Sequence, residues 1–221
     1  MKLYILIFIC FLNQFVSAQL PEGFVYVNDV IPDLKVELRY FSSNNFVGKP
    51  INGYETNRLI LSEAAAHALK LVQQELEQQG MCLLVFDGYR PQRAVNHFMQ
   101  WAQDLNDTIN KHSFYPEVNK KDLFKEEYIA TRSGHSKGST VDLTIFSDAT
   151  NAPLDMGTDY DFFGRESWIH HEGLTEIQKK NRQILQTVML KHGFNNYTKE
   201  WWHFTLKNEP FPNTYFDFPV K

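Results

Sequence analysis

The spacing of apolar residues along the chain predicts two long amphipathic helices. Over residues 62–79 and again over 174–192, apolar side chains return every three or four positions, which places them on one helical face. Ser62 begins the first segment as a helix-capping residue, and Gly80 and Gly193 follow the two segments as helix-ending residues. Each helix therefore has an apolar face that must pack against another element.

Continuous apolar runs between these helices predict the central strands of a sheet. Residues 81–86 and 141–145 are apolar almost throughout, which is typical of strands buried on both faces. A helix is predicted from Pro91 to about residue 105, because proline suits the first turn of a helix. Shorter strands are predicted over residues 24–27, 35–40 and 201–206. Helices and strands are mixed without strict alternation, so the predicted fold class is α+β.

The N-terminal segment has the pattern of a secretory signal peptide. Lys2 is followed by an apolar run from Leu3 to Leu12, and small residues follow at Ser17 and Ala18. The run is about ten residues long, whereas a membrane-spanning helix needs about 20. We therefore expect residues 1–18 to be a cleaved signal peptide and residues 19–221 to form one secreted or periplasmic domain. No stable membrane insertion is expected after cleavage.

Composition and net charge indicate which kinds of binding partner this protein is not expected to have. Of the 221 residues, 22 are Lys or Arg and 26 are Asp or Glu, which gives a formal net charge of −4. The surface as a whole is therefore not basic, and nucleic acid is not expected as a partner. Hydrophobic residues make up 43% of the chain, which excludes a disordered protein. Nothing in the sequence specifies an oligomeric state.

Residues 133–142, with the sequence SGHSKGSTVD, contain two candidate metal ligands. Gly138 lies between His135 and Asp142 and permits a sharp bend, which would bring both side chains to one point. His203, near the end of the chain, supplies a second histidine. Two histidines and one carboxylate are the usual protein ligands of a catalytic zinc ion, with a fourth position open for water. We therefore predict one zinc ion per chain, bound by His135, Asp142 and His203.

Glu200 is the candidate general base. It lies three residues before His203, and in a regular strand these two side chains would point to opposite faces. Convergence on one metal therefore requires a turn or a bulge at Glu200. A carboxylate placed there reaches the water at the metal without being a ligand, which suits a group that accepts a proton.

Arg90 is the candidate group for stabilising the transition state. It lies in the stretch Asp87-Gly88-Tyr89-Arg90-Pro91, between the predicted buried strand and the following helix. A guanidinium group fixed at such a junction can hold a carbonyl oxygen that gains negative charge during amide hydrolysis. Asp87 has two candidate roles, to orient Arg90 or to attract a substrate ammonium group, and we include it among the substrate-binding residues.

Three serines, Ser133, Ser136 and Ser139, lie in the predicted metal loop. Serine hydroxyls in such loops generally form hydrogen bonds with backbone groups, so a structural role is expected for most of them. Ser133 is the exception that we assign to substrate binding.

These motifs together resemble a known enzyme family. The pattern SxHxxGxxxD, with ExxH downstream and DGYRP upstream, is similar to that of the zinc D-alanyl-D-alanine dipeptidases. They are a branch of the LAS group of peptidoglycan peptidases and are related to the dipeptidase of vancomycin resistance. Further matching stretches lie at residues 37–40, 45–48, 139–144, 156–158 and 200–204. The resemblance covers most of residues 19–221.

The resemblance implies both a fold and a reaction. The fold is a LAS/Hedgehog-like zinc peptidase fold, a single α+β domain with a central antiparallel sheet flanked by helices. The reaction is the zinc-dependent hydrolysis of the small dipeptide D-Ala-D-Ala, in peptidoglycan turnover or scavenging. The implied site residues are Glu200 as catalytic base, Arg90 as transition-state stabiliser, His135, Asp142 and His203 as zinc ligands, and Tyr40, Asp87 and Ser133 at the substrate.

Two alternatives remain open. A D,D-carboxypeptidase that trims longer peptidoglycan stem peptides would use the same zinc ligands. A non-enzymatic zinc-binding or wall-binding module would need neither a base nor a transition-state arginine, so Glu200 and Arg90 argue against it.

Overall fold

The computed structural model describes residues 19–221, so the predicted signal peptide lies outside the described residues. Its centre is a mostly antiparallel sheet with the strand order β2-β4-β5-β8-β7, in which β6 also pairs with β5. Only β2 runs parallel to its neighbour β4. These strands are β2 (Lys35–Val36), β4 (Met81–Asp87), β5 (Thr140–Ser147), β6 (Ala152–Pro153), β7 (Phe194–Tyr197) and β8 (Glu200–Leu206). A small second sheet pairs β1 (Phe24–Tyr26) with β3 (Ile60–Ser62).

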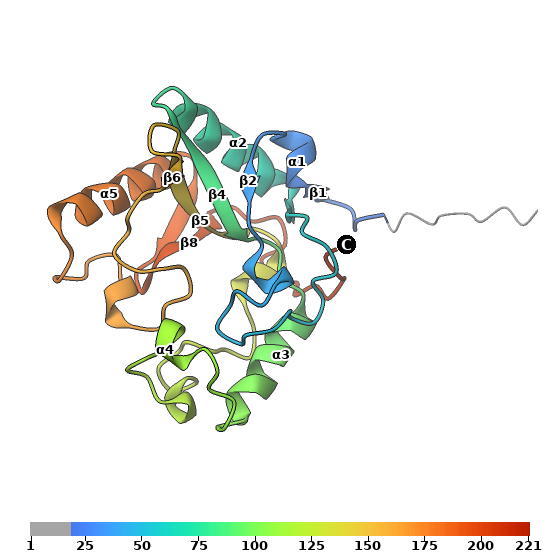
Figure 1. Cartoon of the computed structure of the whole chain (residues 1–221). Helices are drawn as coiled ribbons and strands as arrows, with labels where there is room; N and C mark the ends of the chain where they lie inside the picture. The colour runs from blue at the N-terminus through green and yellow to red at the C-terminus, as the bar shows by residue number, and fades with distance from the viewer. Residues whose placement is uncertain (1–18) are drawn as a thin grey trace, which may run out of the picture.

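Five helices accompany the sheet within the described residues. They are α1 (Val27–Val30), α2 (Glu63–Glu77), α3 (Gln92–Gln103), α4 (Lys111–Phe114) and α5 (Glu176–Lys191). Figure 1 shows α2 and α5 together on one side of the sheet, with α3 and α4 on the opposite side of the molecule. No helix within residues 19–221 is long and apolar enough to cross a membrane. The α+β prediction is confirmed.

The long helices form where the sequence predicts them because both their caps and their apolar faces are satisfied. The side chain of Ser62 accepts a hydrogen bond from the backbone of Ala65 at the start of α2. Thr175 and Gln178 form a reciprocal capping box at the start of α5. The buried faces of the two helices pack on the strands β4, β7 and β8, which is where most of their stability arises.

The predicted strand over residues 35–40 is wrong beyond Val36. Residues Arg39–Phe41 form a short 3-10 turn, and the strand β2 has only two residues. The backbone N–H of Glu37 still donates to the carbonyl oxygen of Val85 on β4 at 2.9 Å, and the N–H of Leu38 donates to the side chain of Asn57. The chain therefore leaves the sheet early, and this exit places Tyr40 beside the candidate site.

The C-terminal segment, residues 207–221, crosses the loop that carries His135. The backbone N–H of Phe216 donates to the carbonyl oxygen of Ser136 at 2.8 Å, and the carbonyl oxygen of Phe216 accepts from the N–H of Gln92 at 3.0 Å. One residue of this segment thus joins the predicted metal loop to the first turn of α3. The segment therefore fixes these two parts of the site relative to each other.

Gly138 supplies the bend that the metal loop requires. It ends the 3-10 turn Gly134–Lys137 with φ +84°, a left-handed conformation that favours glycine. A Cβ atom at this position would lie 2.2 Å from Cε1 of Phe24, closer than any real contact of this kind. The backbone conformation and the packing therefore both select glycine here.

The variant Gly138→Ala should be markedly less stable than the wild type. Its left-handed backbone should cost about 1–2 kcal/mol, and the clash with Phe24 should add about 1–3 kcal/mol. Gly80→Ala is the matched control, because Gly80 has φ +68° and no atom within 4 Å of an added Cβ. Urea denaturation of both variants measures the difference, and equal losses would show that the contact with Phe24 has no energetic weight.

Candidate active site

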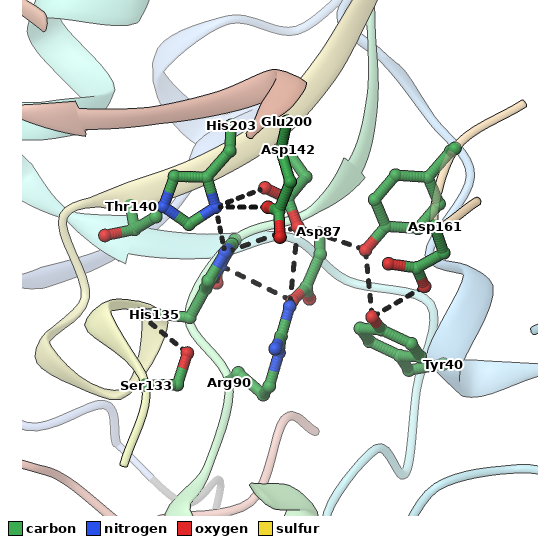
Figure 2. Close-up of polar contacts among 12 residues, drawn as sticks. Tyr40, Asp87, Arg90, Ser133, His135, Thr140, Asp142, Asp161, Glu200 and His203 are labelled. Carbon is green, nitrogen blue, oxygen red and sulfur yellow. Dashed lines mark hydrogen bonds and ion pairs between the residues drawn. The ribbon is translucent and has the colours of Figure 1, made fainter. Parts of the chain in front are cut away.

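Three predicted site residues lie side by side across the centre of the sheet. In the strand register Asp142 on β5 pairs with His203 on β8 and with Asp87 on β4. Side chains of directly opposed residues lie on the same face of a sheet. His135 reaches the same point from the 3-10 turn that precedes β5 (Figure 2). The sheet register therefore brings together residues that are up to 116 positions apart in the chain (203 − 87 = 116).

The predicted metal ligands are spaced as ligands of one ion. Nε2 of His135 lies 3.4 Å from Nδ1 of His203 and 3.3 Å from Oδ2 of Asp142. Nδ1 of His203 lies 3.1 Å from Oδ1 of Asp142. Atoms that are about 2.0–2.2 Å from a tetrahedral zinc ion lie roughly 3.3–3.6 Å from one another. The three side chains therefore fit a metal ion of this size.

The hydrogen bonds around these residues leave suitable lone pairs free. Nδ1 of His135 lies 2.8 Å from the carbonyl oxygen of Gly88 and must donate to it, so Nε2 carries the free lone pair. Oδ1 of Asp142 is buried and makes no hydrogen bond within residues 19–221. A buried carboxylate oxygen without a donor is costly, and a cation bound there would satisfy it.

The electrostatics of the site favour a positive charge. Burial lowers the pKa of His203, but the neighbouring carboxylates of Asp142 and Glu200 outweigh burial and raise this pKa to about 10. Burial likewise raises the pKa of Asp142, and the two histidines outweigh it and lower this pKa overall. The carboxylates thus stabilise a cation between them, whether it is a proton or a metal ion.

Glu200 approaches the metal site through an irregularity in β8, as predicted. Glu200 pairs with Tyr197 on β7, whereas the next pair joins Phe204 to Asn196, so the register shifts between them. Moving one residue along β7 therefore corresponds to moving four residues along β8, so β8 bulges at this point. This shift places Oε2 of Glu200 3.3 Å from Nδ1 of His203. Glu200 is partly exposed and lines the cavity next to the predicted metal ligands.

Arg90 is held in place by Asp87. Nε of Arg90 donates to Oδ2 of Asp87 at 2.8 Å, and the hydroxyl of Tyr54 donates to Oδ1 at 2.6 Å. Asp87 is completely buried and does not line the cavity. Of the two roles considered for Asp87, its contacts fit the orientation of Arg90 and not the binding of a substrate ammonium group.

The remaining predicted residues surround a cavity of about 270 Å³ that opens onto the metal site. Ser133 lines this cavity and also accepts a hydrogen bond from the backbone of His135 at 3.3 Å, so it serves the loop itself. Tyr40 lines it too, with its hydroxyl donating to another side chain, Asp161. The apolar part of the wall consists of Phe46, Val95, Phe98, Ile129, Ala130 and Phe163.

Asp161 is a cavity residue that the sequence did not reveal. It is buried, it has φ +63°, and it accepts a hydrogen bond from Tyr40 at 2.7 Å. Burial raises the pKa of Asp161 well above its usual value. The sequence offered no signal for it, because residues 147–172 have no periodic pattern and one aspartate in a loop is common. Only the fold places this carboxylate opposite the metal ligands (Figure 2).

Comparisons with known proteins agree with this site. The model of a family described as D-Ala-D-Ala dipeptidase matches residues 21–221. A D-alanyl-D-alanine dipeptidase of Enterococcus faecium is 39% identical over 199 residues, which cover 90% of this chain and 98% of that protein. One of Streptomyces coelicolor is 40% identical and covers 89% of this chain and 98% of its own length.

Among solved structures, the LdcB LD-carboxypeptidase matches with a TM-score of 0.41 and 20% sequence identity, over 87% of this chain and 72% of its own. The family model and the dipeptidase relatives span nearly the whole described chain. They show that this protein belongs to the D-Ala-D-Ala dipeptidase family of metal-dependent peptidases.

Proposed function

We propose that this protein is a zinc-dependent dipeptidase that hydrolyses D-alanyl-D-alanine. The observation that carries the proposal is the convergence of His135, Asp142 and His203 beside Glu200 and Arg90 in one small cavity. A cavity of about 270 Å³ has room for a dipeptide. The relatives named D-alanyl-D-alanine dipeptidase support the choice of substrate.

The roles of the residues follow from their positions. A zinc ion held by His135, Asp142 and His203 would supply a Lewis acid that polarises the scissile carbonyl group and acidifies water. Glu200 accepts the proton of the attacking water and passes it to the leaving amine. Arg90 faces the same space with its guanidinium group already fixed, so it stabilises the carbonyl oxygen as that oxygen gains negative charge.

Charged groups in the cavity suit the two ends of a free dipeptide. Asp161 presents a carboxylate for the ammonium group, and Tyr40 holds this carboxylate through its hydroxyl. Ser133 and Arg132 line another part of the wall and offer donors for the substrate carboxylate. A longer stem peptide has an amide in place of the free ammonium group, and Asp161 would then be left without a cation.

An exported location completes the proposal. The pattern of residues 1–18 supports a signal peptide, which would release residues 19–221 outside the cytoplasm. There the substrate would come from fragments of the cell wall. Comparing hydrolysis of D-Ala-D-Ala, of L-Ala-L-Ala and of a pentapeptide ending in D-Ala-D-Ala tests this function. Preference for the pentapeptide would instead support a D,D-carboxypeptidase.

The purified protein should contain about one equivalent of zinc, and a chelator should remove both the metal and the activity. His203→Ala removes one of the three ligands and should lower the zinc content and affinity sharply. His170→Ala is the control, because His170 is exposed and lies outside the cavity. Atomic absorption measures the zinc, and a His203→Ala protein with a full equivalent of tightly bound zinc would refute the ligand set.

Glu200→Gln should keep the zinc and the fold but lower kcat by at least about 10²-fold, because an amide cannot accept the water proton. Glu126→Gln is the control, since Glu126 is an exposed carboxylate outside the cavity wall. Loss of zinc from the Glu200→Gln protein would make Glu200 a ligand. Near-normal activity would show that another group is the base.

Substitution of Arg90 should act on kcat more than on KM, because the guanidinium stabilises charge that develops only in the transition state. Arg90→Ala leaves the buried Asp87 carboxylate without its partner and destabilises the fold. Arg90→Lys keeps the positive charge and loses the planar fork, so it is the better test. We expect kcat to fall by about 10-fold or more with zinc retained. A change confined to KM would indicate uniform substrate binding.

A further inference from the structure

Tyr160 is a buried tyrosine beside the metal ligands that has no role in the proposed reaction. Its side chain is 2% exposed. Its ring stacks on Phe86 with the ring centroids 4.8 Å apart and meets Trp202 edge-on at 5.5 Å. These contacts fix the ring, so packing sets the position of its hydroxyl. That hydroxyl lies 3.1 Å from Oδ2 of Asp142 and is oriented to donate to it.

The same hydroxyl also contacts the substrate side of the cavity. It lies 3.1 Å from the hydroxyl of Tyr40, which donates to Oδ2 of Asp161 at 2.7 Å. Asp142, Tyr160, Tyr40 and Asp161 therefore form one continuous row of polar contacts. Figure 2 shows Asp142 at one end of this row and Tyr40 with Asp161 at the other. The row connects a metal ligand to the carboxylate that faces the substrate ammonium group.

The number of protons in this row makes its two ends interdependent. When Asp161 is ionised, as it must be to pair with an ammonium group, the row has three oxygen–oxygen contacts but only two protons, one on each tyrosine hydroxyl. Tyr40 gives its proton to Asp161, so Asp142 and Tyr40 compete for the single proton of Tyr160. An ammonium group bound at Asp161 brings its own donors and allows the Tyr40 proton to turn toward Tyr160. Tyr160 then donates to Asp142 alone.

We propose that Tyr160 is a positioning residue that holds Asp142 for the metal and couples it to the substrate amine at Asp161. A hydrogen bond to Oδ2 leaves Oδ1 of Asp142 directed toward Nδ1 of His203, at 3.1 Å. The proposal rests on the metal and ammonium sites of the proposed function. Because coupling between two sites is reciprocal, metal binding and amine binding strengthen each other through this row.

Zinc titration of the metal-free protein tests the first half of the proposal. Tyr160→Phe removes the hydroxyl and keeps the ring, and it should weaken zinc binding by about 10-fold or more in competition with a chromophoric chelator. Tyr115→Phe is the control, since the Tyr115 hydroxyl is buried and has no hydrogen-bond partner within residues 19–221. Its zinc affinity should equal that of the wild type. Urea unfolding of the metal-free proteins separates a loss of stability from a loss of affinity.

A double-mutant cycle with Asp161→Asn tests the coupling. Asparagine suits the left-handed backbone at this position, so the fold should tolerate the change. The effect of Asp161→Asn on zinc affinity should be clearly smaller in the Tyr160→Phe background than in the wild-type background, because the hydroxyl of Tyr160 links the two ends of the row. Equal effects in the two backgrounds would refute the coupling.

The outcomes also separate this inference from the proposed function. A wild-type protein that neither binds zinc nor hydrolyses D-Ala-D-Ala would refute the proposed function, and the inference with it. If the wild type does both and Tyr160→Phe binds zinc equally well, the inference alone is wrong. A variant that is less stable but binds zinc normally would show that Tyr160 has only a structural role.

Discussion

The register between three neighbouring strands determines where the site can form. Asp87, Asp142 and His203 are directly opposed on β4, β5 and β8, and a slip of one residue on any strand would turn its side chain to the other face. The apolar residues of β4 and β5 are almost completely buried and oppose such a slip. The hydrophobic core thus fixes the positions of the polar residues that perform the chemistry.

The site contains several charged side chains that are removed from water, so each negative charge needs a positive charge or a hydrogen-bond donor beside it. Asp87, Asp142 and Asp161 are buried carboxylates, and Arg90 is the half-buried cation that forms ion pairs with Asp87 and Asp142. Arg90 offsets Asp87 through a short ion pair, while the histidines offset Asp142, as a bound metal ion also would. Asp161 has only the hydroxyl of Tyr40 as a hydrogen-bond donor within residues 19–221, and in the proposed function a substrate ammonium group is its partner. Stability and substrate binding therefore depend on the same charges.

The sequence predicted those parts of the protein that depend on local patterns. The helices α2 and α5 follow from apolar spacing and capping residues, and the irregularity at Glu200 follows from the need to converge with His203. The early end of β2 was not predictable, because the turn at Arg39–Phe41 is held by contacts with distant residues, such as the N–H of Ile51 that donates to the carbonyl oxygen of Tyr40. Asp161 and Tyr160 were missed for a related reason, since they lie in a loop whose position only the whole fold determines.

The aromatic residues around the site explain how it can be rigid before substrate arrives. The rings of Tyr160 and Tyr40 are buried among other rings, so packing fixes the positions of their hydroxyls. Arg90 is likewise fixed by Asp87, and its guanidinium lies against the ring of Tyr40. Groups that are already oriented need no rearrangement as charge develops on the substrate, and this preorganisation is a major source of catalytic power. The aromatic core is therefore part of the catalytic apparatus, because it holds the polar groups in the geometry that the transition state requires.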